Sequence, residues 1–266
     1  MDQASLQTLL SDLPIGAVRY FATIGSTNDL AARWAEDGAL DLSLVAADEQ
    51  TAGRGRLGRR WITPPGAALA FSLVLKDSSE VDILRYTALG ALAVCDALNA
   101  AFSPMSPAQI KWPNDVIVMQ RKLAGVLVEA HWQGEALTAI VLGIGINVAP
   151  SSVPPEEQLN YPATCVETVL ERPVDRWELL HAVLEKLLYW RMRLGASEFV
   201  MAWGSRLAFR GEWVQVSFDG QPPLEGQVLG LTAEGRLRLR DRQGELHELH
   251  GGELNVRSLS GINRSK

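Results

Sequence analysis

The sequence predicts an α+β protein with a mixed or antiparallel sheet, helices on one face of that sheet, and a small C-terminal β-barrel. Three observations predict this class. Apolar, strand-like segments alternate with glycine-containing turns between residues 42 and 147. Apolar residues recur at helical spacing over residues 80–102 and 163–204. From Phe209 onward, short alternating strands are separated by Asp-Gly, Glu-Gly and Gln-Gly turns.

Length and composition fit this organisation. The chain has 266 residues, of which 47% are hydrophobic and 21% are charged. A chain of this size can bury a sizeable core and divide into one large and one small domain. We therefore expect the larger domain over residues 1–207 and the small β-barrel over residues 208–266.

Charge and cysteine content narrow the class of protein. The net charge is -6, whereas proteins that coat nucleic acid usually carry a basic balance. Cys95 and Cys165 are far apart in sequence and fit free thiols in a reducing compartment. The N-terminal segment lacks the pattern of a signal peptide, and no apolar run approaches the roughly 18 residues of a membrane span. These features predict a cytoplasmic protein without a membrane segment.

The N-terminal segment predicts a helix, a strand and a second helix. Leucines at helical spacing indicate a short helix over residues 1–13, and residues 17–22 fit a strand. Gly25-Ser26-Thr27-Asn28 ends that strand, and Thr27 or Asn28 can cap a helix that runs to about Asp37. The polar side chains of this corner either serve only as caps or form a polar ligand site.

A loop rich in arginine and glycine follows, between strands over residues 42–47 and 67–75. Four arginines alternate with three glycines there: Arg54, Arg56, Arg59 and Arg60 with Gly53, Gly55 and Gly58. Arginine presents a planar fork that matches carboxylate or phosphate, and glycine lets the backbone approach a ligand closely. The loop is therefore either a solvated basic turn or an anion clamp that becomes ordered when an anionic ligand binds.

The rest of the chain is predicted to contain helices, turns and short strands. A long helix covers residues 80–102, and a Pro-Asn-Asp turn at residues 113–115 separates two short strands. A connector over residues 149–162 precedes two or three helices that end near residue 204. The strands of the small domain are predicted at residues 213–218, 226–231, 236–239 and 245–249.

A hairpin is predicted between the turn at residues 113–115 and the connector. Its strands cover residues 126–132 and 136–146, with a Gly-Glu turn between them. Gly143 and Gly145 lie inside the second strand. Glycine in a strand interior indicates that another group packs against the backbone at that point.

Five segments occur in a recognisable order: Ser26-Thr27-Asn28, GRGRLGRRW at 53–61, KWPNDV at 111–116, KLAGVLVE at 122–129 and GIGINV at 143–148. In these segments and in their order, the chain resembles the biotin protein ligases. The tail from Gly251-Gly252-Glu253 to Arg257-Ser258 resembles the family's C-terminal domain, so the resemblance covers residues 15–258. It implies a class II synthetase-like biotin–lipoate ligase catalytic domain followed by an SH3-like barrel. Only 25 residues precede Ser26, which implies the monofunctional type without an N-terminal DNA-binding domain.

The resemblance also implies a reaction, its cofactors and its partners. Biotin and ATP with Mg²⁺ would give biotinyl-5′-AMP and pyrophosphate, and a carrier lysine would then take the biotin and release AMP. The implied partner is the biotin carboxyl carrier protein domain of acetyl-CoA carboxylase or a related carboxylase. We expect a homodimer and no DNA partner. Mg²⁺ is expected to be bound through the ATP phosphates, with no protein ligand assigned.

The matching motifs carry the implied site residues. The catalytic residues are Lys122, Arg56 and Asp115. The biotin-binding residues are Ser26, Thr27, Asn28, Gln50, Gly53, Arg54, Gly55, Arg56, Lys122, Gly125, Gly143 and Gly145. The residues that bind ATP or the adenylate are Arg54, Arg56, Arg59, Trp61, Lys111 and Asn147.

The charges in the first reaction explain why cations are needed. A carboxylate about 4 Å from a phosphate is repelled by roughly 4 kcal/mol at an effective dielectric near 20. The resemblance assigns Lys122 to the position between these charges, and the loop arginines to the phosphates. Asp115 has three candidate roles: it could place Mg²⁺, fix a lysine, or help to deprotonate the incoming lysine.

Two other functions are weighed against this one. A lipoate or octanoyl ligase shares the fold superfamily, but the GRGRLGRRW and KWPND motifs favour the biotin branch. A DNA-binding biotin sensor without catalytic activity is disfavoured by the short segment before Ser26 and by the net charge of -6.

Overall fold

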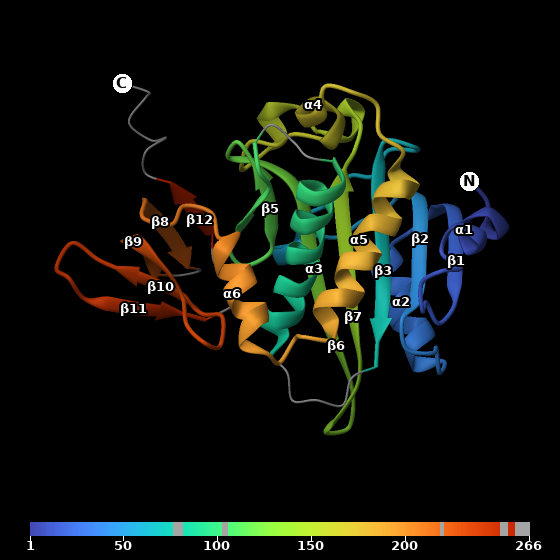
Figure 1. The fold of residues 1–266 in the computed structure, drawn as a ribbon, viewed down its shortest axis with the longest axis horizontal. Coiled ribbons are helices and arrows are strands. Elements are labelled where there is room, and N and C mark those ends of the chain that lie inside the picture. Colours follow the sequence, from blue (N-terminus) through green and yellow to red (C-terminus); the bar gives the residue numbers. More distant parts are fainter. Residues whose placement is uncertain (77–81, 103–105, 219–220, 251–254, 259–266) are drawn as a thin grey trace.

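The structure is a computed structural model that describes residues 1–76, 82–102, 106–218, 221–250 and 255–258. Its larger sheet has seven strands in the order β1-β2-β3-β7-β6-β5-β4 (Figure 1). Their bounds are β1 Val18–Ile24, β2 Ser43–Gln50, β3 Ala68–Leu75, β4 Gln109–Lys111, β5 Asp115–Val118, β6 Arg121–Gln133 and β7 Ala136–Asn147. β1 and β2 are parallel and the other neighbours are antiparallel, so the predicted mixed sheet is confirmed.

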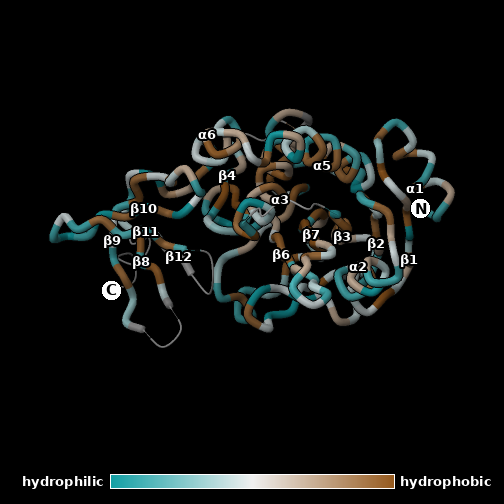
Figure 2. Tube along the Cα trace, turned by 90° about the horizontal axis from the view of Figure 1, so that it is seen from below, coloured by the Kyte–Doolittle hydropathy of each residue, from teal (hydrophilic) through white to brown (hydrophobic). Residues whose placement is uncertain are grey.

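Helices lie on both faces of this sheet. They are α1 Gln3–Leu9, α2 Thr27–Glu36, α3 Ile83–Ala97, α4 Val166–Leu170, α5 Arg176–Arg191 and α6 Ser197–Ser205. The long helices α3 and α5 cover one face and α2 lies on the opposite face (Figure 2), so the prediction of helices on one face holds for α3 and α5 but not for α2. No helix in the described ranges is both long enough and apolar enough to cross a membrane.

The alternation of side chains along the strands divides the core into two layers. Leu44, Phe71 and Leu142 belong to the large cluster beneath α3 and α5. Val45 and Val141, one residue along in each strand, belong to a smaller cluster that packs against α2. The same period of two places Ser72, Gly143 and Gly145 on the α2 face, so the polar site lies beside the start of α2.

The C-terminal domain is a five-stranded antiparallel sheet in the order β11-β10-β9-β8-β12. Its strands are β8 Trp213–Phe218, β9 Gln221–Leu231, β10 Leu237–Arg240, β11 Leu246–Leu249 and β12 Asn255–Ser258. The sequence predicted four of these strands and missed β12. The beginning of the tail motif, residues 251–254, lies outside the described residues.

The C-terminal sheet lies next to α6 (Figure 1), and polar contacts from Trp112 and Arg85 join it to the rest of the molecule. Trp112 Nε1 donates to the carbonyl oxygen of Gly235 at 3.1 Å. The Arg85 guanidinium donates to the carbonyl oxygens of Leu194 and Ala233 at 2.8 and 2.9 Å. A motif of the large domain, KWPNDV, therefore touches a turn of the small domain directly.

Candidate active site

Ser26 is the cap of α2, which corrects the assignment of that cap to Thr27 or Asn28. The backbone of Ser26 is extended, and its hydroxyl accepts a hydrogen bond from the Asp29 amide at 3.4 Å. A cap residue precedes the first helical turn and supplies an acceptor to that turn's free N–H groups. Because Ser26 does this, the side chains of Thr27 and Asn28 are left to face the sheet.

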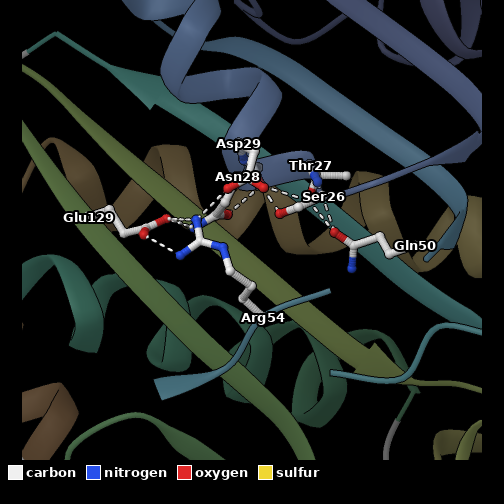
Figure 3. A network of polar contacts seen from close by, with 8 residues as sticks. Ser26, Thr27, Asn28, Asp29, Gln50, Arg54 and Glu129 are labelled. Carbon is white, nitrogen blue, oxygen red and sulfur yellow. Dashed lines mark hydrogen bonds and ion pairs between the residues drawn. The ribbon is translucent and has the colours of Figure 1, made fainter. Parts of the chain in front are cut away.

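Thr27 and Asn28 belong to a buried row of polar groups (Figure 3). Thr27 donates from its amide and its hydroxyl to Gln50 Oε1 at 2.8 and 3.0 Å. The hydroxyl of Ser72 on β3 lies 2.8 Å from the Thr27 hydroxyl and 2.6 Å from Asn28 Oδ1. Such a row offers several donors and acceptors at fixed positions in a site that is largely shielded from water.

A small cavity of about 50 Å³ adjoins this row. Most of the sequence-predicted biotin-binding residues line it, namely Ser26, Thr27, Asn28, Gln50, Arg54, Gly55, Arg56, Lys122, Gly125, Gly143 and Gly145. Trp61 lines it as well. Gly53 does not line it; this glycine is buried, and a β-carbon there would collide with the backbone of Trp61 and crowd Gln50.

The glycines of β6 and β7 make room for protein side chains. A β-carbon at Gly143 would collide with the Asn28 amide, and one at Gly145 would collide with the Trp61 indole. At Gly125 it would lie 3.2 Å from the end of the Lys122 side chain. The prediction that another group packs against the backbone at Gly143 and Gly145 is therefore confirmed. The groups are the side chains of Asn28 and Trp61, which line the small cavity.

The arginine loop folds back on itself as a short hairpin. The amide of Gly55 donates to the Arg59 carbonyl at 2.7 Å, and the amide of Trp61 donates to the Gly53 carbonyl at 2.9 Å. Gly58 turns the chain with a φ of 69°, in the left-handed region that favours glycine. That the loop becomes ordered when an anionic ligand binds stays a prediction.

The loop arginines have different surroundings. Arg54 is bound by carboxylates, with Glu129 at 2.7 Å and Asp29 at 2.6 Å. Arg56 donates to the side-chain oxygen of Asn114 at 2.8 Å. Arg59 is exposed and lines a second, larger cavity. The sequence predicts all three arginines as anion ligands, and the differences among their surroundings appear only in the structure.

The second cavity measures about 440 Å³ and is cationic. The basic residues Arg56, Arg59, Arg60, Lys111 and Lys122 line it, and Asp115 is the one carboxylate among its lining residues. Trp61 and Asn147 also line it, which gathers the predicted ATP-binding residues around one space. Arg54 is the exception, because it lines the small cavity alone.

Lys122 lies where the two cavities meet and lines both. Its ammonium is 2.7 Å from Asp115 Oδ1, and the ammonium of Lys111 is 4.0 Å from Asp115 Oδ2. The Lys111 side chain is only 6% exposed, and its ammonium lies 3.8 Å from the centre of the Tyr161 ring. The predicted catalytic residues Lys122 and Asp115 are therefore in direct contact, and Arg56 shares both cavities with Lys122.

Sequence reasoning missed several residues that line or support the site. They are Asp29, Ser72, Asn114, Glu129 and Tyr161. Strand periodicity could have placed Glu129 at the site, because it follows Gly125 by four positions in a strand and so faces the same side of the sheet. Ser72 and Tyr161 carry no such local signal, since their partners are distant in sequence.

Comparison with known proteins agrees with this arrangement. The profile of the Biotin/lipoate A/B protein ligase family matches residues 20–147. A biotin–[acetyl-CoA-carboxylase] ligase from Paracoccus denitrificans is 34% identical over 229 residues, which cover 84% of this chain and 94% of that protein. The bifunctional ligase/repressor BirA of Bacillus spizizenii is 30% identical over 230 residues, covering 85% of this chain and 70% of that protein.

Solved structures lead to the same group. A biotin protein ligase from Aquifex aeolicus in complex with biotin and ATP superposes with a TM-score of 0.77 at 29% sequence identity. The superposition covers 91% of this chain and 99% of that one. Within the wider biotin and lipoate ligases, the chain belongs to the biotin protein ligase family.

Proposed function

We propose that this protein is an ATP-dependent biotin–protein ligase, which makes biotinyl-5′-AMP and transfers the biotin to a carrier lysine. The observation that carries the proposal is the position of Lys122. Its ammonium lies where a small polar cavity meets a larger cationic one. A carboxylate from one cavity and a phosphate from the other would meet at that cation.

The small cavity would hold the bicyclic ring system of biotin. A ureido group presents both donors and acceptors, and Ser26, Thr27, Asn28 and Gln50 can pair with them. A site that buries such groups rejects a ligand that cannot pair with them. The cavity of about 50 Å³ is small beside typical ligand sites of roughly 300 Å³ or more. We therefore expect Trp61, which lines both cavities, to shift when biotin enters.

In the first step, a biotin carboxylate oxygen forms a bond to the α-phosphorus of ATP. The bond from that phosphorus to the β-phosphate oxygen breaks, and pyrophosphate leaves with the electron pair. Lys122 would offset the repulsion between the two anions, and Arg56 and Arg59 would stabilise the charge on the phosphates. Trp61 and Asn147 would contact the adenine, and the buried Trp61 Nε1 has no hydrogen-bond partner among the described residues.

The residues of the larger cavity fit a Mg²⁺ ion that arrives with ATP. Mg²⁺ usually binds through one or two carboxylates together with substrate phosphates. Asp115 is the one carboxylate among the described residues of this lining, and ammonium groups face both of its oxygens: Lys122 lies 2.7 Å from Oδ1 and Lys111 lies 4.0 Å from Oδ2. Mg²⁺ would supply neutralisation of part of the phosphate charge, and Asp115 would hold it by exchanging its contact with Lys111 for the ion while keeping Lys122.

In the second step, the ε-amine of a carrier lysine attacks the carbonyl carbon of the anhydride. An amide bond forms, AMP leaves with the electrons of the broken C–O bond, and the amine nitrogen gives up one proton to solvent or to a base. Asp115 fixes Lys122 at 2.7 Å, which supports a positioning role. A base role is tested with Asp115→Asn and preformed biotinyl-AMP; an unchanged transfer rate would rule it out.

The relatives point to the partner. A protein named biotin–[acetyl-CoA-carboxylase] ligase supports the biotin carboxyl carrier domain of a carboxylase as the acceptor.

A homodimer and the lack of DNA binding stay predictions, to be tested by light scattering and by gel shift. We place the catalytic domain at residues 1–207 and the SH3-like domain at residues 208–266. The free, buried Cys95 and Cys165 support a reducing, cytoplasmic location.

The test is ATP–pyrophosphate exchange with biotin, lipoate or octanoate as the only added acid. Exchange that depends on biotin is expected, since this reaction reports adenylate formation without a carrier. Exchange with lipoate or octanoate instead would place the protein in the sister branch. Tight biotin binding without exchange would make it a sensor and overturn the role given to Lys122.

A further inference from the structure

Arg54 is held in place by two acidic residues (Figure 3). Its Nη1 and Nη2 donate to the two oxygens of Glu129 at 2.7 and 2.9 Å. Its Nη2 also donates to Asp29 on α2 at 2.6 Å. A guanidinium bound by two carboxylates has little charge left for an incoming anion. Its effect is to tie the start of the arginine loop to β6 and to α2.

Glu129 has a second partner inside the small cavity. Asn28 Nδ2 donates to Glu129 Oε2 at 2.7 Å, and Asn28 Oδ1 lies 2.6 Å from the Ser72 hydroxyl. An ionised carboxylate only accepts hydrogen bonds, so Glu129 requires the nitrogen of the amide to point toward it. The oxygen must then face Ser72. One carboxylate thus sets the orientation of a cavity-lining amide and also holds the loop.

We propose that Glu129 is a positioning residue for the biotin site, acting through Asn28 and Arg54 to make the ring-binding cavity and the arginine loop one unit. The proposal rests on the proposed function, because it takes biotin as the occupant of the small cavity. Glu129 contacts Arg54 and Asn28 and is not expected to touch a reacting atom of biotin or ATP. Its removal should therefore weaken biotin binding and release the loop, with a smaller effect on the chemical step.

The negative charge of Glu129 is essential to this role. Three N–H groups, two from Arg54 and one from Asn28, donate to its two oxygens. Glutamine keeps the shape but has one oxygen, and its NH₂ group would face a donor. Hydrogen bonds to a charged acceptor are roughly twice as strong as neutral ones. Glu129→Gln is consequently a nearly isosteric change that removes the proposed function of the residue.

The experiment measures biotin binding by calorimetry and the KM values of the exchange reaction. We expect Glu129→Gln to raise the Kd and the KM for biotin about tenfold or more, and the KM for ATP by less than about threefold. Glu135→Gln is the matched control. It lies in the exposed β6–β7 turn of the same hairpin and should change neither value.

Arg54→Gln and the double variant separate the coupled role from general destabilisation. If Glu129 acts partly through Arg54, the two losses in biotin affinity overlap and the double variant binds clearly better than the sum predicts. Cleavage by trypsin after the loop arginines gives a second readout, independent of activity. It should be faster in Glu129→Gln than in the wild type.

The failure of this inference is distinguishable from the failure of the proposed function. Wild-type protein that neither binds biotin nor exchanges pyrophosphate with it would refute the proposed function. Normal wild-type activity, with an unchanged biotin Kd in Glu129→Gln, would refute the role of Glu129 alone. A Glu129→Gln variant with a lower melting temperature but unchanged biotin affinity and trypsin sensitivity would show a merely structural residue.

Discussion

At the scale of single residues, Lys122 is one of two basic residues in the described ranges, with Arg56, that line both cavities. The ionic contact with Asp115 at 2.7 Å fixes the ammonium, and Trp61 lies beside it with the ring centre 5.6 Å from Nζ. The side chain is 26% exposed, so the charge lies at the opening of the site. In the proposed reaction, a fixed cation at this place would stabilise charge in the transition state without rearranging first.

Lys122→Ala tests that role. We expect the rate of biotin-dependent pyrophosphate exchange to fall by about 10²–10³, the range found for removal of one preorganised electrostatic group. The fold should persist because the side chain is partly exposed. Lys186→Ala, at an ion pair on the surface of α5, is the control. An exchange rate within about threefold of wild type would exclude Lys122 from the first step.

The ionisation of Glu129 gives a prediction about pH. Burial raises its pKa, but the hydrogen bonds from Arg54 and Asn28 together outweigh burial and lower the pKa below its usual 4.5. A lowered pKa in the folded state means that the contribution is complete above the ordinary pKa and is lost as pH falls through the folded value. The advantage in biotin affinity of wild type over Glu129→Gln should thus be constant between about pH 6 and 8. Calorimetry across that range checks this, and a strong slope near neutral pH would contradict it.

At the scale of elements, the site depends on the contact between β7 and the arginine loop. Alternate residues of β7 face α2, first as the apolar Ala139 and Val141 and then as Gly143 and Gly145. The apolar pair packs against the helix, and the glycines admit the Asn28 amide and the Trp61 indole. β7 therefore contributes apolar side chains to the core in its first half and lines the site with glycines in its second half.

Gly145→Ala should displace Trp61. A β-carbon there would overlap the indole, and overpacking of this kind costs about 1–3 kcal/mol unless the neighbour moves. Because Trp61 is on a loop, we expect it to move, which would raise the KM for ATP by roughly tenfold and change tryptophan fluorescence. Gly195→Ala is the control, since no atom lies within 4 Å of a β-carbon there. Unchanged kinetics and fluorescence would disprove the contact.

At the scale of the whole molecule, the C-terminal sheet contacts the KWPNDV motif of the candidate site through the turn at Gly235. The turn at Gly235 has a φ of 87°, and its carbonyl accepts the hydrogen bond from Trp112 Nε1. A β-carbon at Gly235 would collide with Trp203 of α6, so the turn fits closely between two tryptophans. Trp112 precedes Asn114 and Asp115 by two and three positions, so the small domain supports the turn that carries Asn114 and leads into Asp115 at the start of β5.

Trp112→Phe tests this connection. The substitution removes the indole donor and leaves the buried Gly235 carbonyl without that partner, which should lower the free energy of unfolding by about 1–3 kcal/mol. Denaturation in urea measures the change. Trp132→Phe is the control, because Trp132 is 62% exposed and should give a wild-type curve. Equal curves for both variants would show that the contact contributes nothing to stability.

The order of elements followed from local patterns. Apolar periodicity located the helices and the strands of the large sheet, and the turns of the small domain located four of its five strands. The missed strand, β12, is a short tail segment whose pairing with β8 is a non-local event. The face of the sheet on which α2 packs depends on the side along which the chain crosses from β1 to β2. The local sequence pattern does not determine that side.

The sequence by itself determined most of the chemical groups that line the two cavities, because the motifs contain the donors, acceptors and charges that those cavities use. Only the tertiary structure decided which of them meet. Arg54 looked like an anion ligand in its motif, yet it pairs with Glu129, 75 positions away. The physical reason is that a hydrogen bond depends on distance in space, and folding brings β6, α2 and the loop together at one point of the sheet.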